Sequence, residues 1–346
     1  MTVVPETARV PERTDAATAV VVRRTCRAFT AVVGAVVFAV CGAATPSSAA
    51  SPAPLAVLPK GAEVVHPAPP APTSASCTAS AMPPSPMPAP GHMPAGSYMS
   101  QIEARGFLRV GVDQNTYLWG YRDPATGQLT GFDIDMLQQV AQAIFGSSDP
   151  RYIHYVIVPN DQRMQAVQDG EVDIVAETMT ITCEREKSVD FSTVYYEAGQ
   201  RILVPVNSTI TGPQDLGGKR VCATKGSTSL QNLVAGDMPR HIQLWGVNDE
   251  TDCLVMLQQG QVDAISTDDA ILLGLAAQDP NTKVVGPTFS SEPYGMAISK
   301  AHPDFTSFVN GVLAQVRNDG VWTQIYGETL APYTGTTPPP PAASYR

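Results

Sequence analysis

The sequence predicts an α/β protein of two similar lobes that are joined by two crossings of the chain. One pattern occurs twice, at residues 164–182 and 254–269: a helical segment, a glycine, a Val-Asp pair, a short apolar strand and a polar strand end. Apolar runs that end in polar residues also alternate with helical patterns over residues 99–332, which is typical of βα units. A chain that repeats such a unit is expected to form two lobes that face each other.

The predicted elements place the first lobe at residues 99–199 and 294–332 and the second at residues 200–293. Buried strands are predicted at 107–112, 153–158 and 172–176, and a helix with Asp133 as its cap is predicted to end at Gly146. Strands at 200–204 and 293–298 would carry the chain between the lobes and form a hinge. An amphipathic helix at 305–316 closes the first lobe, and residues 333–346 are expected to be a disordered tail.

The first 41 residues predict an export signal. Arg23, Arg24 and Arg27 precede an apolar run from Ala28 to Val40 that is too short to span a bilayer. Cleavage before Cys41 would make this cysteine the acylated first residue of a lipoprotein, which predicts a location on the outer face of the membrane or in the periplasmic space. Ordinary cleavage after Ala50 and a twin-arginine signal are the alternatives.

Residues 42–98 are rich in proline, alanine and serine and carry almost no charge. Such a segment buries too little apolar surface to offset the entropy of folding, so we expect a semi-extended tether. A tether that follows a lipid-bearing cysteine would let the folded body reach a membrane partner.

Four cysteines lie beyond the predicted signal: Cys77, Cys183, Cys222 and Cys253. An even number in an oxidising compartment suggests two disulfides, and four cysteines allow three pairings. Cys222 at a strand end and Cys253 at a helix start form the favoured pair, which leaves Cys77 for Cys183. Free buried thiols are the alternative. The sequence contains no Cys-x-x-Cys spacing, so no metal site is predicted.

The formal charge of −10 argues against nucleic acid as a partner. It becomes about −12 without residues 1–40, because that segment holds five of the 22 basic and three of the 32 acidic residues. The net negative charge of the protein repels an anion, so any bound anion must be held by positively charged or hydrogen-bonding groups close to it.

Polar residues at the predicted strand ends suggest the ligand. Thr178, Thr180 and Arg185 follow the strand at 172–176, where small molecules bind in open α/β sheets. The guanidinium of Arg185 matches a carboxylate, whereas Asp268 in the second lobe would attract a cation. One cation and one anion on facing lobes predict a bound amino acid.

Further candidates lie at the other strand ends. A glycine and hydroxyls at a helix start favour an anion at Thr224, Lys225, Ser227 and Thr228, although an ordinary helix cap would explain Ser227 alone. Arg163 is either a site residue or a solvated surface charge. Trp119 either covers the aliphatic stem of a ligand or packs in the core.

Taken together, several motifs resemble the family 3 solute-binding proteins, the amino-acid receptors of bacterial ATP-driven importers. The resemblance covers nearly all of residues 99–332. The motifs that carry it are Gly131-Phe132-Asp133-Ile134-Asp135, Val172-Asp173-Ile174, Thr180-Ile181-Thr182-Cys183-Glu184-Arg185, Val189-Asp190-Phe191-Ser192, Asp215-Leu216-Gly217-Gly218-Lys219, Gly226-Ser227-Thr228-Ser229, Thr267-Asp268-Asp269 and Asn318-Asp319-Gly320. The receptors that it resembles most are the glutamate-, aspartate- and glutamine-binding lipoproteins of actinobacteria.

The resemblance implies a type II periplasmic-binding-protein-like clamp, acting as a monomer, that delivers glutamate, aspartate, glutamine or asparagine to an ABC permease. It implies that Arg185 holds the ligand α-carboxylate with Thr180 and the Ser227 region, and that Asp268 takes the α-ammonium. Arg163 falls where acidic-amino-acid receptors hold a side-chain carboxylate. Asp113 falls where glutamine receptors accept from a side-chain amide, so these two residues favour different ligands.

Two other functions fit the sequence less well. An enzyme is disfavoured, because the sequence has no nucleophile with a neighbouring base, no His-Glu metal motif and no Gly-x-Ser-x-Gly elbow, and no cofactor is predicted. A tethered sensor that reports to a membrane signalling protein is the alternative to transport.

Overall fold

We describe the protein from a computed structural model, which covers residues 57–66, 81–235 and 241–346. These residues all belong to one compact unit, Pro54–Arg346. The predicted signal, its Cys41, and Cys77 lie outside the described residues. Within the described ranges, every helix is too short or too polar to cross a bilayer.

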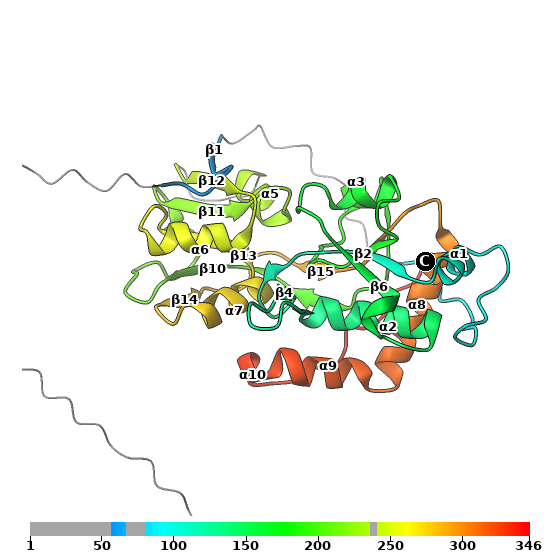
Figure 1. Cartoon of the computed structure of the whole chain (residues 1–346). Helices are drawn as coiled ribbons and strands as arrows, with labels where there is room; N and C mark the ends of the chain where they lie inside the picture. Colours follow the sequence, from blue (N-terminus) through cyan, green and yellow to red (C-terminus); the bar gives the residue numbers. More distant parts are fainter. Residues whose placement is uncertain (1–56, 67–80, 236–240) are drawn as a thin grey trace, which may run out of the picture. The chain divides into compact units, whose positions relative to one another are not determined.

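The first lobe is built on a five-stranded sheet (Figure 1). Its order is β6 (Ile153–Ile157), β2 (Leu108–Val112), β7 (Ile174–Val175), β16 (Ala297–Ile298) and β8 (Asp190–Phe191). The first three strands are parallel, and β16 is antiparallel to both of its neighbours. Around this sheet lie α1 (Tyr98–Arg105), α2 (Phe132–Phe145), α3 (Arg163–Gln168), α4 (Cys183–Glu186), α8 (Pro303–Asn318), α9 (Val321–Thr329) and α10 (Ala331–Thr334), with β3 (Asn115–Thr116), β4 (Gly120–Arg122) and β5 (Leu129–Thr130) in a small separate sheet.

The second lobe repeats this arrangement. Its sheet has the order β1 (Glu63–Val65), β12 (Gln243–Val247), β11 (Arg220–Thr224), β13 (Ala264–Asp268), β10 (Gln200–Pro205) and β14 (Thr282–Val285). Strands β12, β11 and β13 are parallel, and β10 is antiparallel to both of its neighbours. Helices α5 (Thr228–Ala235), α6 (Glu250–Gln258) and α7 (Asp269–Gln278) pack on this sheet.

The central strands β10 and β11 are covered on both faces, so each contains consecutive buried apolar residues, at 202–204 and 221–223, instead of an alternating pattern. Ile202 and Val204 enter the core cluster that contains Leu230 of α5, whereas Leu203 between them enters the cluster that contains Leu254 of α6. A strand of period two thus supplies two cores at once.

The lobes are joined by a two-stranded ribbon. Strand β9 (Tyr196–Ala198) pairs antiparallel with β15 (Glu292–Tyr294), with Glu197 opposite Pro293. Directly after β9 the chain enters β10 of the second lobe, and shortly after β15 it enters β16 of the first. Strands β10 and β16, each antiparallel to both of its neighbours, are therefore the strands that have just crossed from the other lobe.

The repeated Val-Asp pair has the same structural role in both lobes. In the first lobe Asp173 accepts from the backbone N of Arg109 at 2.8 Å and from its guanidinium at 2.7 Å. In the second lobe Asp263 accepts from the backbone N of Arg220 at 2.8 Å and from its guanidinium at 2.6 Å. Each aspartate thus joins the start of the third parallel strand to the start of the first, which accounts for the repeat in the sequence.

The predicted disulfide between Cys222 and Cys253 is present and ties β11 to α6, with Cα atoms 5.6 Å apart. The second predicted pair stays a prediction, because Cys77 is not described.

The predicted cap of α2 was wrong. Gly131 is the N-cap residue, at φ 122°, and a Cβ there would lie 2.3 Å from the carbonyl oxygen of Trp119. Asp133 is instead buried and accepts from the backbone N of Thr178 at 2.8 Å and from the hydroxyl of Tyr195 at 2.6 Å. It holds the segment after β7 in place.

The sequence predicted a tether at 42–98 and a disordered tail at 333–346. The described parts of both segments instead make contacts with the folded body. Residues 63–65 form β1, because the edge of β12 offers unpaired backbone groups that another strand can satisfy. Residue Met82 accepts from Asn310 of α8 at 2.8 Å, and Met93 is buried. The two segments also meet each other, since Ala81 forms a bridge with Tyr345. Composition predicted disorder, but these backbone groups find partners on the folded body.

Candidate functional site

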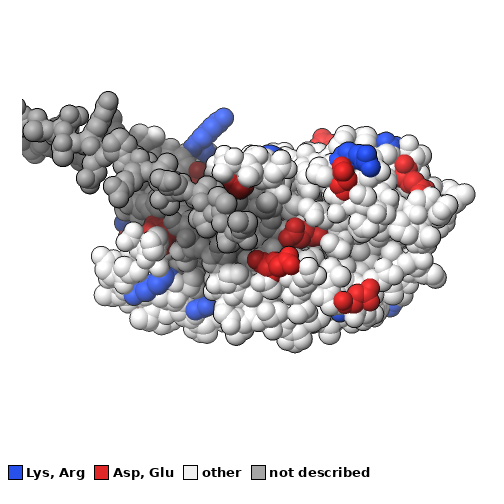
Figure 2. All heavy atoms as spheres, turned by 60° about the horizontal axis from the view of Figure 1, so that its bottom comes forward, with Lys and Arg blue, Asp and Glu red and all other residues white. Residues whose placement is uncertain are grey.

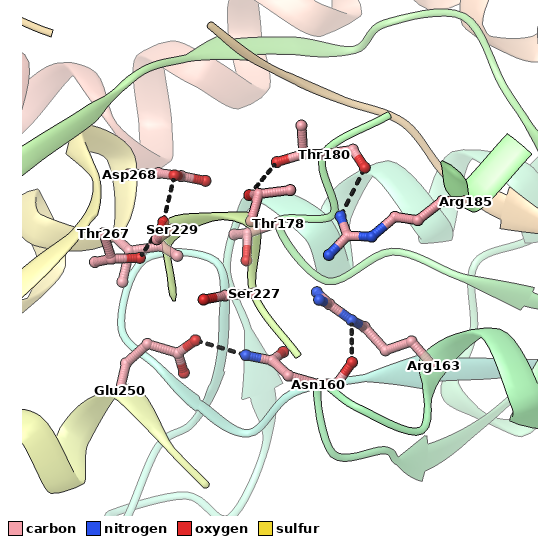
Figure 3. Close-up of a pocket in the computed structure, with 12 residues that line it drawn as sticks. Asn160, Arg163, Thr178, Thr180, Arg185, Ser227, Ser229, Glu250, Thr267 and Asp268 are labelled. Carbon is pink, nitrogen blue, oxygen red and sulfur yellow. Dashed lines mark hydrogen bonds between the residues drawn. The ribbon is translucent and has the colours of Figure 1, made fainter. Parts of the chain in front are cut away.

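A small cavity between the lobes gathers most of the residues predicted from the strand ends (Figure 3). Its volume is about 10 Å³, which is room for about one water molecule, so the lobes are closed on it. The first lobe contributes residues at the ends of β6 and β7 and in α3 and α4, and the second contributes residues from α5, α6, β13 and α7. The lining residues are Asn160, Arg163, Thr178, Thr180, Arg185, Ser227, Thr228, Ser229, Glu250, Thr267, Asp268 and Ile271.

Arg185 reaches the cavity from α4. Its Nη1 donates to the carbonyl of Thr180 at 2.7 Å, and its Nη2 donates across the cleft to the carbonyl of Gly226 at 3.0 Å. Burial is the main cause that lowers the pKa of this guanidinium to about 9, and the neighbouring charge of Arg163 lowers it further. A ligand carboxylate would favour the charged form of Arg185.

Arg163 lies beside Arg185 and is also buried (Figure 3). Its Nε donates to the carbonyl of Asn160 at 2.9 Å, and its Nη1 donates to the carbonyl of Glu177 at 2.8 Å. Arg163 is therefore not a solvated surface charge, because its side chain is enclosed and lines the cavity.

Asp268 faces the same cavity from the end of β13 in the other lobe. Its two oxygens accept from the hydroxyls of Ser229 at 3.1 Å and Tyr294 at 2.8 Å. Burial first, and then the charge of Glu292, raise the pKa of Asp268 to about 8. A ligand cation would stabilise the ionised form, because it would replace the solvation that burial removes.

The hydroxyls of Thr180 and Thr228 meet at the interface between the lobes. Both donate to the same oxygen, Oε2, of Glu292 in the hinge strand β15, at 2.8 and 2.7 Å. The other oxygen of Glu292 accepts from Asn232 at 2.9 Å and from Ser290 at 2.6 Å. Glu292 is thus a buried carboxylate held by four neutral donors.

The helix start at Ser227 has the contacts of an ordinary cap. The hydroxyl of Ser227 donates to the carbonyl of Thr224 at 2.6 Å and accepts from the backbone N of Leu230 at 3.0 Å. Gly226 lies so close to the first lobe that a Cβ there would be 2.7 Å from the Cα of Asp161. The loop therefore closes the cavity while its serine caps α5.

The remaining wall of the cavity is a polar pair across the cleft. Nδ2 of Asn160 in the first lobe donates to Oε1 of Glu250 in the second at 2.8 Å. Burial first, and then the charges of Asp113 and Asp249, raise the pKa of Glu250 to about 7.

Behind this pair lies a second cavity of about 190 Å³, which Asn160 and Glu250 also line. Glu177 lines it too and is buried, and its Oε2 has no hydrogen-bond partner among the described residues. Burial raises the pKa of Glu177 well above its ordinary value.

Four predicted candidates do not line the first cavity. Lys225 turns to the outer edge of the sheet, where its Nζ donates to the carbonyl of Gly61 at 2.9 Å and pairs with Glu63 at 3.4 Å. Trp119 is fully buried in the core of the first lobe, and its Nε1 donates to the carbonyl of Ala270 at 3.1 Å. Thr224 is buried beneath the helix start. Asp113 lines the second cavity, where it accepts from the backbone N of Thr116 at 2.7 Å.

Sequence reasoning missed several residues of this region. Asn160 follows the end of β6, so the rule that selected Thr178 from the end of β7 could have found it. Glu177 stands beside the selected Thr178 without any distinguishing pattern. Glu292 is the first residue of the hinge strand β15 and gives no local signal, because its role depends on partners from both lobes.

Comparison with known proteins identifies the family of this chain. Residues 108–330 match the model of the bacterial extracellular solute-binding proteins, family 3. The chain is 38% identical over 229 residues to the ABC transporter glutamine-binding protein GlnH of Bacillus subtilis, a match that covers 66% of this chain and 82% of that protein. It is 31% identical over 245 residues to the glutamate-binding protein GluB of Corynebacterium glutamicum, with 67% of this chain and 81% of that protein covered. Among solved structures, an ancestral arginine-binding protein bound to glutamine matches with a TM-score of 0.59 and 36% identity, covering 65% of this chain and 98% of that one.

Proposed function

Because the chain belongs to the bacterial extracellular solute-binding proteins of family 3, we propose that it binds one polar L-amino acid outside the cytoplasm and delivers it to an ABC importer. The candidates are glutamine, glutamate, asparagine and aspartate. The relatives named above support this range, since they are glutamine- and glutamate-binding proteins.

The observation that carries the proposal is the placement of Arg185 and Asp268. They come from different lobes, line one cavity and are both buried. The negative charge of Asp268 also raises the pKa of Arg185, so the two side chains interact across the cleft. An amino acid carries one negative and one positive group on the same carbon, so it can satisfy the two side chains at once, with its carboxylate at Arg185 and its ammonium at Asp268.

This placement also explains how binding would close the clamp. Only a conformation in which the lobes approach each other offers both charged partners to one ligand. The ligand therefore binds the closed form more tightly and shifts the population toward it. An importer that recognises the closed surface would then select loaded receptors.

Calorimetry of Arg185→Ala with the four candidate amino acids tests the proposal. A micromolar ligand has a binding free energy of about −8 kcal/mol, and leaving its carboxylate buried without a partner costs several kcal/mol, so the variant should show no measurable binding. Arg122→Ala is the matched control, because Arg122 is exposed and lies outside the cavity. Micromolar affinity in Arg185→Ala would refute the role given to this residue.

The proposal also includes where the protein is located and what happens to its ligand. The protein would be exported, anchored through an acylated Cys41 and active as a monomer, and it would release its ligand unchanged. Lysines and arginines do not gather into a basic patch on the described part of the face in Figure 2, which fits a small-molecule ligand better than nucleic acid. Cys41→Ser should move the protein from the membrane fraction to the soluble fraction, and incubation with the ligand should yield no product.

A further inference from the structure

The proposed function leaves open which side chain the ligand carries, and one wall of the cavity bears on this question. If Arg185 takes the α-carboxylate and Asp268 the α-ammonium, the other charged or amide side chains on the lining are Asn160, Arg163 and Glu250. These three lie together at one side of the cavity, away from Asp268 (Figure 3). The side chain of the ligand has to meet them.

We propose that this wall recognises a primary carboxamide, so that the ligand is glutamine or asparagine and not the corresponding acid. The inference rests on the proposed function, since it assumes that an amino acid is bound by Arg185 and Asp268. It assigns Arg163 as the donor to the amide oxygen and Glu250 as the acceptor from the amide nitrogen.

The pairing follows from donor and acceptor chemistry. A guanidinium has only donors, and an ionised carboxylate has only acceptors. A carboxamide carries an acceptor oxygen and a donor nitrogen side by side, so it can satisfy Arg163 and Glu250 together. Asn160 already donates to Glu250 from the opposite lobe, which fixes the carboxylate against the cavity.

The two competing ligand classes satisfy only half of this wall. A carboxylate side chain can pair with Arg163 but brings no proton for Glu250, and two buried anions then face each other. A guanidinium side chain can pair with Glu250 but offers no acceptor to Arg163. Sites that hydrogen-bond a particular group discriminate strongly against analogues that leave a buried partner unpaired.

The acidic residues around Glu250 also favour a neutral ligand side chain that can donate a hydrogen bond. The second cavity behind it is lined by Asp113, Glu177 and Asp249, and the Oε2 of Glu177 lacks a partner among the described residues. Arg163 is the neighbouring cation that compensates Glu177. A ligand carboxylate would add a further negative charge to this group, whereas an amide adds none.

The test is calorimetry with glutamine, asparagine, glutamate, aspartate and arginine at pH 8, on the wild type and on Glu250→Gln. The wild type should bind a carboxamide at least about tenfold more tightly than the matching acid. Glu250→Gln should bring the two within about threefold, mainly because the acid gains affinity. Asp252→Asn, in the same helix but outside the cavity, is the control and should keep the wild-type ratio.

The outcomes separate the two proposals. Equal or tighter binding of the acid, or tightest binding of arginine, by the wild type would overturn the carboxamide inference and leave the clamp intact. Binding of no amino acid by a folded wild type would overturn the proposed function itself. An unchanged ratio in Glu250→Gln would remove Glu250 from the recognition.

A second measurement needs no variant. A ligand acid is tolerated best when Glu250 is protonated, so the preference for the carboxamide should widen as the pH rises from 6 to 8. The groups that face Glu250 are Asp113, Asp249, Glu177 and Asn160. A preference that stays constant or narrows over this range would contradict the inference, even if Glu250→Gln failed to fold.

Discussion

The hydroxyls of Thr180 and Thr228, from opposite lobes, lie 3.3 Å apart and donate to the same oxygen of Glu292. Each hydroxyl has a single proton, and both protons are directed to the hinge strand. In this arrangement neither hydroxyl has a proton left for a ligand carboxylate, so we expect Arg185 and not Thr180 to donate to it. One buried carboxylate in the hinge thus links the site to the contact between the lobes.

Replacing Glu292 should weaken closure. Glu292→Ala leaves the donors of Thr180, Thr228 and Asn232 without their buried acceptor, at about 1 to 3 kcal/mol for each unsatisfied group. We expect ligand affinity to fall by about tenfold or more. Fluorescence transfer between labels on the two lobes should show a larger open fraction at half-saturating ligand. Glu197→Gln is the matched control, since this glutamate lies on the partner strand β9 and is exposed. Closure that is equal in both variants would exclude a role for Glu292.

The pKa of Asp268 predicts how affinity depends on pH. Burial raises the pKa from 3.8 to about 8, so between these values the folded protein holds a proton that the unfolded chain has released. The free energy of unfolding contributed by this group is therefore highest at low pH and declines as the pH rises through 8. A ligand ammonium favours the ionised carboxylate, and binding must expel the proton. Affinity should rise between pH 6 and 8, by up to about tenfold per unit.

Calorimetry in two buffers of different ionisation enthalpy would detect the released proton directly. The measurement is best made in Glu250→Gln, because Glu250 also titrates in this range with a pKa of about 7. Asp268→Asn should lose binding, whereas Asp252→Asn should keep the slope, since Asp252 lies in α6 outside the cavity. Affinity that is flat from pH 6 to 8 would argue against an ionised Asp268 as the partner of the ammonium.

Removing the disulfide should cost stability but not binding. Cys222 and Cys253 are 31 residues apart, and chain-entropy arguments assign about 3 to 4 kcal/mol to a loop of this size. Both cysteines pack in the core of the second lobe, outside the cavity. The double variant Cys222→Ala, Cys253→Ala should unfold at lower denaturant concentration and bind the ligand with wild-type affinity below its melting temperature. A large loss of affinity in the folded variant would mean that the disulfide shapes the site.

Replacing Thr178 by glycine should have an unusual effect on the free energy of unfolding. Its φ of 42° lies in the left-handed region, where a β-branched residue is strained by about 1 to 3 kcal/mol. Thr178→Gly should therefore leave the free energy of unfolding unchanged or raise it, despite the extra flexibility of glycine. Thr130→Gly, at an exposed strand position with ordinary backbone angles, should lower it by about 1 kcal/mol. Chemical denaturation of both variants is the measurement, and a marked loss of stability in Thr178→Gly would show that its side-chain contacts outweigh the strain.

The sequence alone determined the features that depend on neighbours along the chain. The repeated Val-Asp pair predicted two similar lobes, and the structure shows that Asp173 and Asp263 brace equivalent strands. Polar residues after apolar strands predicted Thr178, Arg185 and Asp268, because the carboxyl ends of parallel strands meet at one edge of a sheet. Periodicity and strand ends are local properties, so they can be recognised without coordinates.

The tertiary structure decided what depends on how distant segments meet. It turned Lys225 away to Glu63, moved Trp119 into the core and brought residues of the expected tether and tail onto the body. It also joined Asn160 to Glu250, and Thr180 to Thr228 through Glu292, pairs that are at least 48 residues apart. Such contacts arise when two separately folded lobes dock, and a hydrogen bond across a cleft leaves no periodic trace in either partner's sequence.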